Sequence, residues 1–439
     1  MMRPIAAIVG RPNVGKSTLF NRIAGERISI VDDAPGVTRD RVYADCDWRG
    51  RDFTLVDTGG LDPAAEDIIG RQVYEQAEIA IETASVIIFL TDIKTGVTAA
   101  DAAVAEVLRR SGKPVVLAVN KADDIKNAEA DAYEFYSLGL GDPIAVSAGQ
   151  ALCIGDLLDA VFAHFDDAAE APEEGDLIRV AVVGKPNAGK SSLINKILGQ
   201  ERLLVSDIPG TTRDAVDTFI KRGGRTYSFI DTAGMRKKSR IKENIEHYAV
   251  LRAIAAVERA DVCVIMISAE DGVGEQDTKI AGIAHNRGKA SIIAVNKWDK
   301  VEKDSKTMDA FSKEINGDLS YMPYAPKVFI SALTGQRVHK IFDYIDAVWE
   351  NSAMRVSTGV LNDALIEATA TTPPPARRGK ALKIYYASQV GVKPPTFVLF
   401  VNDAELLHYS YKRFLENQIR ENFGFAGVPI TLIARNRKD

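Results

Sequence analysis

This chain of 439 residues contains little cysteine and no long apolar runs. Cys46, Cys153 and Cys263 lie far apart and lack the spacing of metal ligands, which argues against a zinc site or a disulfide framework. Apolar runs such as VIIFL at 86–90 are about five residues long, too short to cross a membrane or to form the core of a secretion signal. We therefore expect a cytoplasmic protein that does not contact membranes.

A large excess of one charge sign is also missing, since the net charge is only −5. This balance argues against a protein that coats nucleic acid along its whole length. The charge is nevertheless uneven, because residues 352–439 hold 12 Lys plus Arg against 7 Asp plus Glu, a local balance of +5. A nucleic-acid partner is therefore expected at this basic C-terminal part.

The most informative feature of the chain is an internal repeat. GRPNVGKSTLFNRIAGER at 10–27 returns as GKPNAGKSSLINKILGQER at 184–202, displaced by 174 residues. The segments that follow repeat in the same order, with PGVTRD returning as PGTTRD, DTGG as DTAG, NKAD as NKWD and SAG as SAL. The repeat predicts two copies of one domain.

Apolar runs alternate with helical patterns in both copies, which predicts α/β domains with mostly parallel sheets flanked by helices. The composition is that of a globular protein, with 46% apolar and 26% charged residues. After about residue 350 the order helix, strand, strand, helix, strand predicts a small α+β domain with its helices on one face of the sheet. The expected division is a first domain at 1–165, an acidic flexible linker at 166–177, a second domain at 178–350 and a C-terminal domain at 351–439.

Each copy contains the pattern G-x-x-x-x-G-K-S between a predicted strand and a predicted helix, which is typical of a phosphate-binding loop. Glycine lets backbone N–H groups approach phosphate oxygens, and the amino end of a helix favours their charge. Lys16 and Lys190 are predicted to reach the β- and γ-phosphates, and the hydroxyls of Ser17 and Ser191 to bind Mg²⁺. A tight turn without a ligand is the alternative, and two matched copies argue against it.

Further contacts to Mg²⁺ and the γ-phosphate are predicted at Thr38, Asp57 and Gly60 in the first copy and at Thr212, Asp231 and Gly234 in the second. The aspartates end predicted strands, where a carboxylate can hold Mg²⁺ through water. The threonine hydroxyls would sense the metal and the γ-phosphate in the triphosphate state, and the glycines would supply a backbone N–H. Taken alone, such a threonine is more often a turn residue.

The N-K-x-D segments predict which base is bound. Asp123 and Asp299 can accept two hydrogen bonds from guanine, whereas adenine has no such pair of donors and would leave the carboxylate unpaired. The asparagine and lysine of each segment are expected to brace the loop and to stack along the base. Residues predicted to contact nucleotide in the first copy are Gly10, Asn13, Val14, Gly15, Lys16, Ser17, Thr18, Asp57, Gly60, Asn120, Lys121, Asp123, Ser147 and Ala148. Those in the second are Gly184, Asn187, Ala188, Gly189, Lys190, Ser191, Ser192, Asp231, Gly234, Asn296, Lys297, Asp299, Ser331 and Ala332.

Together, the tandem motifs and the basic C-terminal part resemble the bacterial Der (EngA) family of double-Era-like GTPases over essentially the whole chain. The resemblance implies hydrolysis of GTP, a K homology-like (KH-like) C-terminal domain, and association with the large ribosomal subunit during its assembly. The expected partners are GTP, GDP, the large subunit and its RNA, and we expect a monomer. A catalytic role is assigned to Lys16, Thr38, Gly60, Lys190, Thr212 and Gly234.

One position departs from the pattern of Ras-like enzymes. Where they have a glutamine that orients the attacking water, four residues after the metal-site aspartate, this chain has Leu61 and Met235. The resemblance to GTPases with a hydrophobic residue here implies that K⁺ replaces an arginine finger and is held by Asn13 and Asn187. The alternative is that both asparagines only stabilise the turn of the loop.

Three segments are candidates for contact with RNA. MRKKSRIK at 235–242 follows DTAG and contains five basic residues, so the nucleotide at the second site could control its exposure, although a solvated loop is the alternative. GFAG at 424–427 matches the G-x-x-G loop of KH modules, but its place after a long helix favours a helix C-cap at Gly424. The remaining candidates for phosphate contact, which solvent exposure would explain equally well, are Arg377, Arg378, Lys380 and Lys383.

Two other functions stay open at this point. One is a nucleotide-controlled interaction module that scarcely turns GTP over at one site, which hydrolysis rates measured site by site would reveal. The other is a GTPase of tRNA modification, which shares the asparagine of the phosphate-binding loop. The missing cysteine after Cys263 and the missing second cofactor motif argue against that second alternative.

Overall fold

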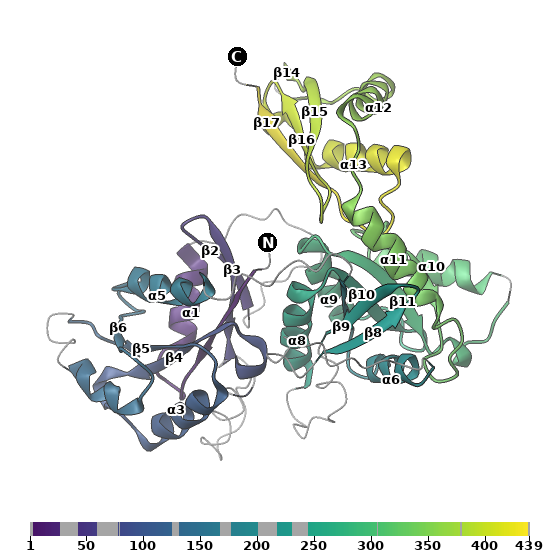
Figure 1. Ribbon diagram of the computed structural model, residues 1–439. Helices are drawn as coiled ribbons and strands as arrows, with labels where there is room; N and C mark the ends of the chain where they lie inside the picture. The colour runs from purple at the N-terminus through teal and green to yellow at the C-terminus, as the bar shows by residue number, and fades with distance from the viewer. Residues whose placement is uncertain are drawn as a thin grey trace. The chain divides into compact units, whose positions relative to one another are not determined.

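The computed structural model describes residues 3–26, 43–58, 78, 80–124, 131–166, 177–200, 217–230, 245–304, 306–377 and 380–437. The chain divides into two compact units, Met1–Glu174 with Ile241–Glu258, and Gly175–Arg240 with Arg259–Asp439. Each unit contains a large, mostly parallel sheet, and the second unit also contains a separate three-stranded sheet (Figure 1). Within the described residues, no helix is long and apolar enough to cross a membrane.

The sheet of the first unit has six strands in the order β2-β3-β1-β4-β5-β6. All neighbours are parallel except β2, which pairs antiparallel with β3. The carboxyl ends of the central strands therefore meet at one edge, where open α/β sheets bind their ligands. The strands are β1 (Ile5–Val9), β2 (Tyr43–Trp48), β3 (Arg51–Asp57), β4 (Val86–Asp92), β5 (Val115–Asn120) and β6 (Ile144–Ala145).

Helices cover both faces of this sheet, which explains why every residue of β1 and β4 is buried and why their sequences are almost continuously apolar. Helices α1 (Lys16–Glu26) and α5 (Ile154–Asp166) share one hydrophobic core with the sheet. Helix α3 (Ala99–Ser111) lies on the other side of the sheet (Figure 1). None of its buried residues is part of the core that α1 and α5 share with the sheet. Two short 3₁₀ helices complete the unit, η2 (Ile93–Thr95) and η3 (Tyr133–Leu138).

The large sheet of the second unit has the order β12-β11-β10-β7-β9-β8, which is the order of the first sheet read from the other edge. Again all neighbours are parallel except the outermost pair, here β8 and β9. The strands are β7 (Leu177–Val183), β8 (Thr218–Arg222), β9 (Arg225–Phe229), β10 (Val262–Ser268), β11 (Ala290–Asn296) and β12 (Lys327–Phe329). The helices of this unit before the C-terminal domain are α6 (Lys190–Gln200), α9 (Glu275–Asn286), η4 (Trp298–Lys300), α10 (Thr307–Asp318) and α11 (Lys340–Ala353). Helix α8 (Ile245–Arg259) precedes β10 in the chain, and all of it except its last residue belongs to the first unit. The prediction of two α/β domains of the same fold is confirmed.

The C-terminal domain has the predicted order of helix, two strands, helix and strand, with one addition. Its three-stranded sheet pairs β15 (Ile384–Gly391) antiparallel with β16 (Thr396–Val401), and β16 parallel with β17 (Thr431–Asn436). Helices α12 (Thr358–Thr371) and α13 (Tyr409–Phe423) share one core with a single face of this sheet, as predicted (Figure 1). The addition is a small hairpin of β13 (Ala376–Arg377) and β14 (Lys380–Ala381).

The helix expected near 403–422 is divided in two in the structure. Asp403 caps the short 3₁₀ helix η5 (Ala404–Leu406) by accepting the N–H of Glu405, and the His408 side chain then accepts the N–H of Ser410 at the start of α13. Each of these two side chains caps the start of a separate helix, so the N–H groups are satisfied without one continuous helix. The regular helix therefore starts later than the apolar pattern suggests.

The loop after α13 joins the C-terminal domain to the second large sheet. The carbonyl oxygen of Gly427 accepts the N–H of Ser291 at the start of β11 at 2.7 Å, and the N–H of Gly427 donates to the carbonyl oxygen of Tyr324 at 2.8 Å. Gly427 has φ +78°, and a Cβ atom there would lie 2.1 Å from Cγ1 of Val348, so a side chain does not fit. Gly424 is the C-cap of α13, as its sequence context predicted.

Candidate functional site

The first phosphate-binding loop connects β1 to α1. The helix begins at Lys16, whose Nζ donates to the carbonyl oxygens of Gly10 at 2.6 Å and Arg11 at 2.9 Å. A Cβ atom on Gly15 would lie 2.4 Å from Nδ2 of Asn120, and one on Gly10 would lie 2.3 Å from a carbonyl oxygen of β4, so both positions require glycine. The loop thus folds around the ammonium group at the amino end of a helix, which is the arrangement that phosphate binding needs.

The second loop, between β7 and α6, repeats these contacts. Nζ of Lys190 donates to the carbonyl oxygens of Gly184 at 2.7 Å and Lys185 at 2.8 Å. Gly189 has φ +101°, and a Cβ atom there would lie 2.0 Å from Nδ2 of Asn296. Both predicted phosphate-binding loops therefore have the same local structure.

Burial lowers the pKa of both loop lysines from an ordinary value of 10.5 to about 8. The loss of hydration disfavours the charged ammonium group, and the nearby carboxylates, Asp57 for Lys16 and Asp277 for Lys190, offset only part of this effect. A phosphate beside either lysine would favour the charged form and raise its pKa again.

We expect nucleotide affinity at both sites to fall as the pH rises above about 8. Phosphate stabilises the charged lysine, so binding above this pH requires uptake of a proton, whereas below it the proton is already bound. Between pH 7.5 and 9.0 the affinity for GDP should drop by roughly five- to tenfold. Titration with a fluorescent GDP derivative at fixed Mg²⁺ measures this, and a constant affinity across the range would contradict the expectation.

Oxygen atoms suited to Mg²⁺ meet at the first site. The hydroxyl of Ser17, in the first turn of α1, donates to Oδ2 of Asp57 at 2.8 Å, and Asp57 at the end of β3 is 1% exposed. Magnesium prefers such hard oxygen ligands, so these two residues fit the ion, which would neutralise phosphate charge when bound. At the second site Ser191 has the corresponding position at the start of α6, whereas Asp231 lies outside the described residues.

Asparagines at the ends of β5 and β11 connect the predicted base-binding segments to the phosphate-binding loops. Nδ2 of Asn120 donates to the carbonyl oxygen of Val14 at 2.7 Å, and its Oδ1 accepts the N–H of Ala148 at 3.0 Å. Asn296 makes the same two bonds, to the second loop at 2.8 Å and from Ala332 at 2.9 Å. Both amides are almost fully buried, so they brace each site from within.

The carboxylate of Asp123 is exposed and oriented by two donors, Nζ of Lys94 at 2.7 Å and Oγ of Ser147 at 2.8 Å. Both hydrogen bonds lower the pKa of this carboxyl group, and the one from Lys94 has the larger effect. A charged and oriented carboxylate is what recognition of the two guanine donors requires. Asp299 at the second site is exposed as well, and Oγ of Ser331 nearby accepts the N–H of Thr334 at 3.1 Å.

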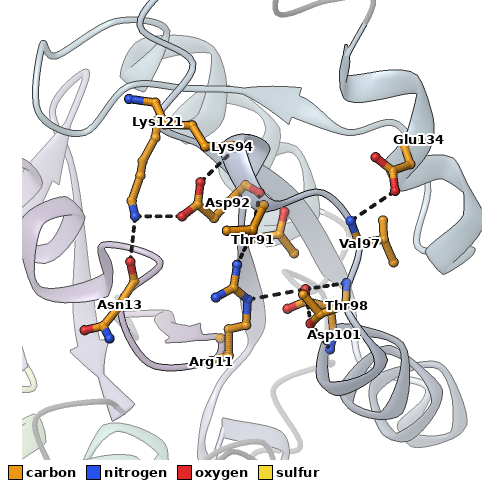
Figure 2. A network of polar contacts seen from close by, with 12 residues as sticks. Arg11, Asn13, Thr91, Asp92, Lys94, Val97, Thr98, Asp101, Lys121 and Glu134 are labelled. Atoms are coloured by element: carbon orange, nitrogen blue, oxygen red, sulfur yellow. Dashed lines mark hydrogen bonds and ion pairs between the residues drawn. The ribbon is translucent and has the colours of Figure 1, made fainter.

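The lysine of each N-K-x-D segment has an acidic partner that the sequence analysis missed. Figure 2 shows Lys121, whose Nζ donates to the carbonyl oxygen of Asn13 at 2.8 Å and pairs with Oδ2 of Asp92 at 2.6 Å. Lys297 pairs with Glu270 at 2.9 Å. An acidic residue at or just after the end of the preceding strand in both repeats was the signal that could have revealed these pairs.

A second missed contact joins each phosphate-binding loop to the helix that follows β4 or β10. Nε of Arg11 lies 3.5 Å from Oδ2 of Asp101, which also accepts the hydroxyl of Thr98 at 2.7 Å at the start of α3 (Figure 2). Nζ of Lys185 lies 3.6 Å from Oδ2 of Asp277 at the start of α9. Both carboxylates are almost fully buried. A basic residue directly after the first glycine and an acidic one at the start of this helix recur in both repeats.

The loop asparagines predicted to hold K⁺ have left-handed backbone conformations. Asn13 has φ 65° and Asn187 has φ 62°, and both side chains are exposed. Among residues other than glycine, asparagine adopts this region most readily. The conformation is thus a sufficient reason for asparagine here, and exposure also leaves the side chains accessible to a cation.

Several predicted site residues lie outside the described residues, as does the basic segment at 235–242. The individual residues concerned are Thr38, Gly60, Leu61, Thr212, Asp231, Gly234, Met235 and Arg378. Thr18 and Ser192 are described, and both are exposed in the first turns of α1 and α6.

The two large sheets have the same strand order, and in each of them the asparagine of an N-K-x-D segment braces a phosphate-binding loop. These features define a protein of the P-loop GTPase class with two sites in tandem. The family model of the 50S ribosome-binding GTPase matches residues 5–121 and 179–297. The model described as the KH-domain-like C-terminal domain of EngA bacterial GTPase enzymes matches residues 355–435. The chain belongs to the Der (EngA) family of bacterial GTPases.

Curated relatives match the chain over its whole length. GTPase Der of Ruminiclostridium cellulolyticum is 60% identical over 438 residues, covering 100% of this chain and 99% of the relative. GTPase Der of Agathobacter rectalis is 59% identical over 439 residues, covering 100% of both chains. Among solved structures, Era of Aquifex aeolicus bound to GDP and AlF₄⁻ covers 60% of this chain and 93% of its own, at 21% identity and a TM-score of 0.30, which is too low to support an argument. The chain is therefore a GTPase, and it hydrolyses GTP to GDP and phosphate.

Proposed function

We propose that this GTPase acts in the assembly of the large ribosomal subunit and binds ribosomal RNA in a manner controlled by its nucleotides. The observation that carries the proposal is the presence of two phosphate-binding loops with matching lysine contacts on a chain that also has a basic KH-like domain. A family description that names 50S ribosome binding supports it. A basic domain supplies attraction to RNA phosphates, and the nucleotide sites supply the means to regulate it.

In this proposal the chain works as three domains, at 1–165, 178–350 and 351–439, and an acidic flexible linker at 166–177 joins the first domain to the second. Lys16 and Lys190 bind the β- and γ-phosphates, Asp123 and Asp299 select guanine, and the loop serines bind Mg²⁺. Thr38 and Gly60 of the first site, and Thr212 and Gly234 of the second, respond to the γ-phosphate. We further propose that the chain is a monomer in the cytoplasm.

Sedimentation with purified large ribosomal subunits tests the proposed function. With a non-hydrolysable GTP analogue in K⁺ buffer the chain is expected to pellet with the large subunit, and with GDP it is expected to stay largely in the supernatant. The reason is that only the triphosphate offers a γ-phosphate to the threonines and glycines named above. Small subunits serve as the control, and absence from the large-subunit pellet in both nucleotide states would refute the proposal.

We also propose that K⁺ stimulates GTP hydrolysis through Asn13 and Asn187. Turnover is expected to be roughly tenfold faster in K⁺ than in Na⁺, because a bound cation stabilises charge as an arginine finger does. Replacing both asparagines by glycine is the sharpest variant, since glycine keeps the left-handed turn at φ 65° and 62° while it removes the side-chain oxygen. The glycine variant should lose the difference between the two ions, and equal wild-type turnover in K⁺ and Na⁺ would disprove the proposal.

A further inference from the structure

One face of the C-terminal sheet carries exposed aromatic rings together with basic side chains. The other face is covered by α12 and α13 and contributes Ala387 and Leu399 to the domain core (Figure 1). Side chains alternate across a strand, so the neighbours of these residues point away from the helices. Tyr386 on β15 and Phe400 on β16 are partners on this uncovered face, and Arg435 on β17 is the next partner in the same row.

The aromatic rings of this face are arranged for stacking. The rings of Tyr386 and Phe400 lie 4.3 Å apart at an interplanar angle of 15°, and Tyr386 is still 43% exposed. The register of β15 shifts between Ile384 and Tyr386, and the intervening residue, Tyr385, is 40% exposed. One face of the Tyr386 ring lies against Phe400. Because the residue is nevertheless well exposed, we infer that the other ring face is available to a planar ligand.

Three basic residues surround these rings. Nζ of Lys383 lies 5.3 Å from the centroid of the Tyr385 ring, and Cζ of Arg437 lies 5.1 Å from it. Arg437 follows Arg435 by two residues and therefore lies on the same side of the sheet. In the part of the chain that the structure describes, no ion pair joins Lys383, Arg435 or Arg437 to a carboxylate. Their positive charges therefore remain available to attract a negatively charged partner.

We propose that this face, formed by Lys383, Tyr385, Tyr386, Phe400, Arg435 and Arg437, binds single-stranded RNA by stacking a base on Tyr386 and contacting phosphates through the three basic residues. The partner must combine planar apolar surfaces with negative charge, and nucleic acid in single-stranded form offers both, whereas a duplex hides its bases. The inference rests on the proposed function, because it names the surface by which ribosomal RNA is held.

Anisotropy titration of the full-length chain with a fluorescein-labelled single-stranded RNA of eight nucleotides tests the surface. Tyr386→Leu keeps apolar contact with Phe400 but removes the ring, so binding should weaken about tenfold. Tyr409→Leu is the matched control, because Tyr409 is 55% exposed on α13, which packs on the opposite face of the sheet. Binding of an RNA duplex of equal length should be the same for both variants.

A second variant tests the charges separately. In Arg435→Gln with Arg437→Gln, the slope of log affinity against log salt should become shallower by about 1.4, since two phosphate contacts are lost. If Tyr386→Leu binds the single strand as tightly as Tyr409→Leu, or loses duplex binding equally, the proposed stacking surface is wrong.

Sedimentation with large subunits separates this inference from the proposed function. If wild type pellets with subunits and Tyr386→Leu does so equally, while also keeping its affinity for the single strand, the surface is wrong and the ribosomal role stands. If wild type does not pellet, the ribosomal role fails, and the oligonucleotide titration still decides the surface. Loss of pelleting by Tyr386→Leu with unchanged affinity for the single strand would assign the face to a protein partner and overturn the RNA assignment.

Discussion

Lys16→Ala is expected to lower the nucleotide content of the chain from two equivalents to one, and Lys190→Ala is expected to remove the other equivalent. Each lysine sits at the start of a helix with Nζ held by two loop carbonyl groups, from which it can turn to the phosphates. Loss of two charge-assisted hydrogen bonds, at about 1.5–3 kcal/mol each, corresponds to roughly 10²–10⁴ in affinity at that site.

Equilibrium dialysis with labelled GDP measures the stoichiometry of each variant. Lys279→Ala is the matched control, because Lys279 is a lysine on α9 whose partner is the exposed Glu275 within the same helix. The control should bind two equivalents, and the double variant Lys16→Ala, Lys190→Ala should bind none. Two equivalents of GDP bound tightly to Lys16→Ala would show that the first loop does not hold phosphate through this lysine.

Asp123→Asn and Asp299→Asn are expected to change the preferred base from guanine to xanthine, each at its own site. The carboxylate accepts hydrogen bonds from guanine N1 and N2, whereas xanthine has an oxygen at the second position, which the amide of asparagine can satisfy by donating. A mismatched pair loses about 1.5–3 kcal/mol for each charge-assisted bond, so the affinity for GDP should fall by about a hundredfold or more.

Competition between GDP and xanthosine diphosphate at each site measures this change. Each aspartate variant is combined with the loop-lysine variant of the other domain, so that only one site is read. Asp124→Asn is the matched control, since Asp124 is the exposed neighbour of Asp123 in the same segment. Weakened GDP binding without any gain for the xanthine nucleotide would mean that the carboxylate supports the loop and does not read the base.

The sequence predicted those features that depend on local chemistry repeated at fixed spacing. Glycine at positions 15 and 189, the lysine after it and the asparagine of N-K-x-D were all predicted, and the structure brings them together at both sites. The strand sequences predicted a parallel sheet because burial on both faces demands continuous apolar residues. The order of the C-terminal elements followed from the same patterns.

Other features could not be predicted because they depend on contacts between distant segments. Asp101 and Asp277 recur in both repeats, but the sequence does not say what they contact, and their pairing with the phosphate-binding loops becomes visible only when the sheet brings the helix and the loop together. The late start of α13 depends on capping by Asp403 and His408. Each cap is a single hydrogen bond from a backbone N–H to a side chain, and it competes with the hydrogen bonds of a continuous helix. The pairing of Tyr386 with Phe400 and Arg435 depends on strand register.

The bonds that hold Gly427 between Ser291 and Tyr324 are made entirely by main-chain atoms. Such bonds do not depend on the identity of the side chains around them, apart from the glycine itself, where a Cβ atom would meet Val348. Ser291 and Tyr324 can therefore be exchanged during evolution without loss of these two bonds. These two contacts can therefore persist while the surrounding sequence diverges, whereas the contacts that the side chains of Asn351 and Arg413 make with the carbonyl oxygens of Ala426 and Ser320 depend on those two side chains.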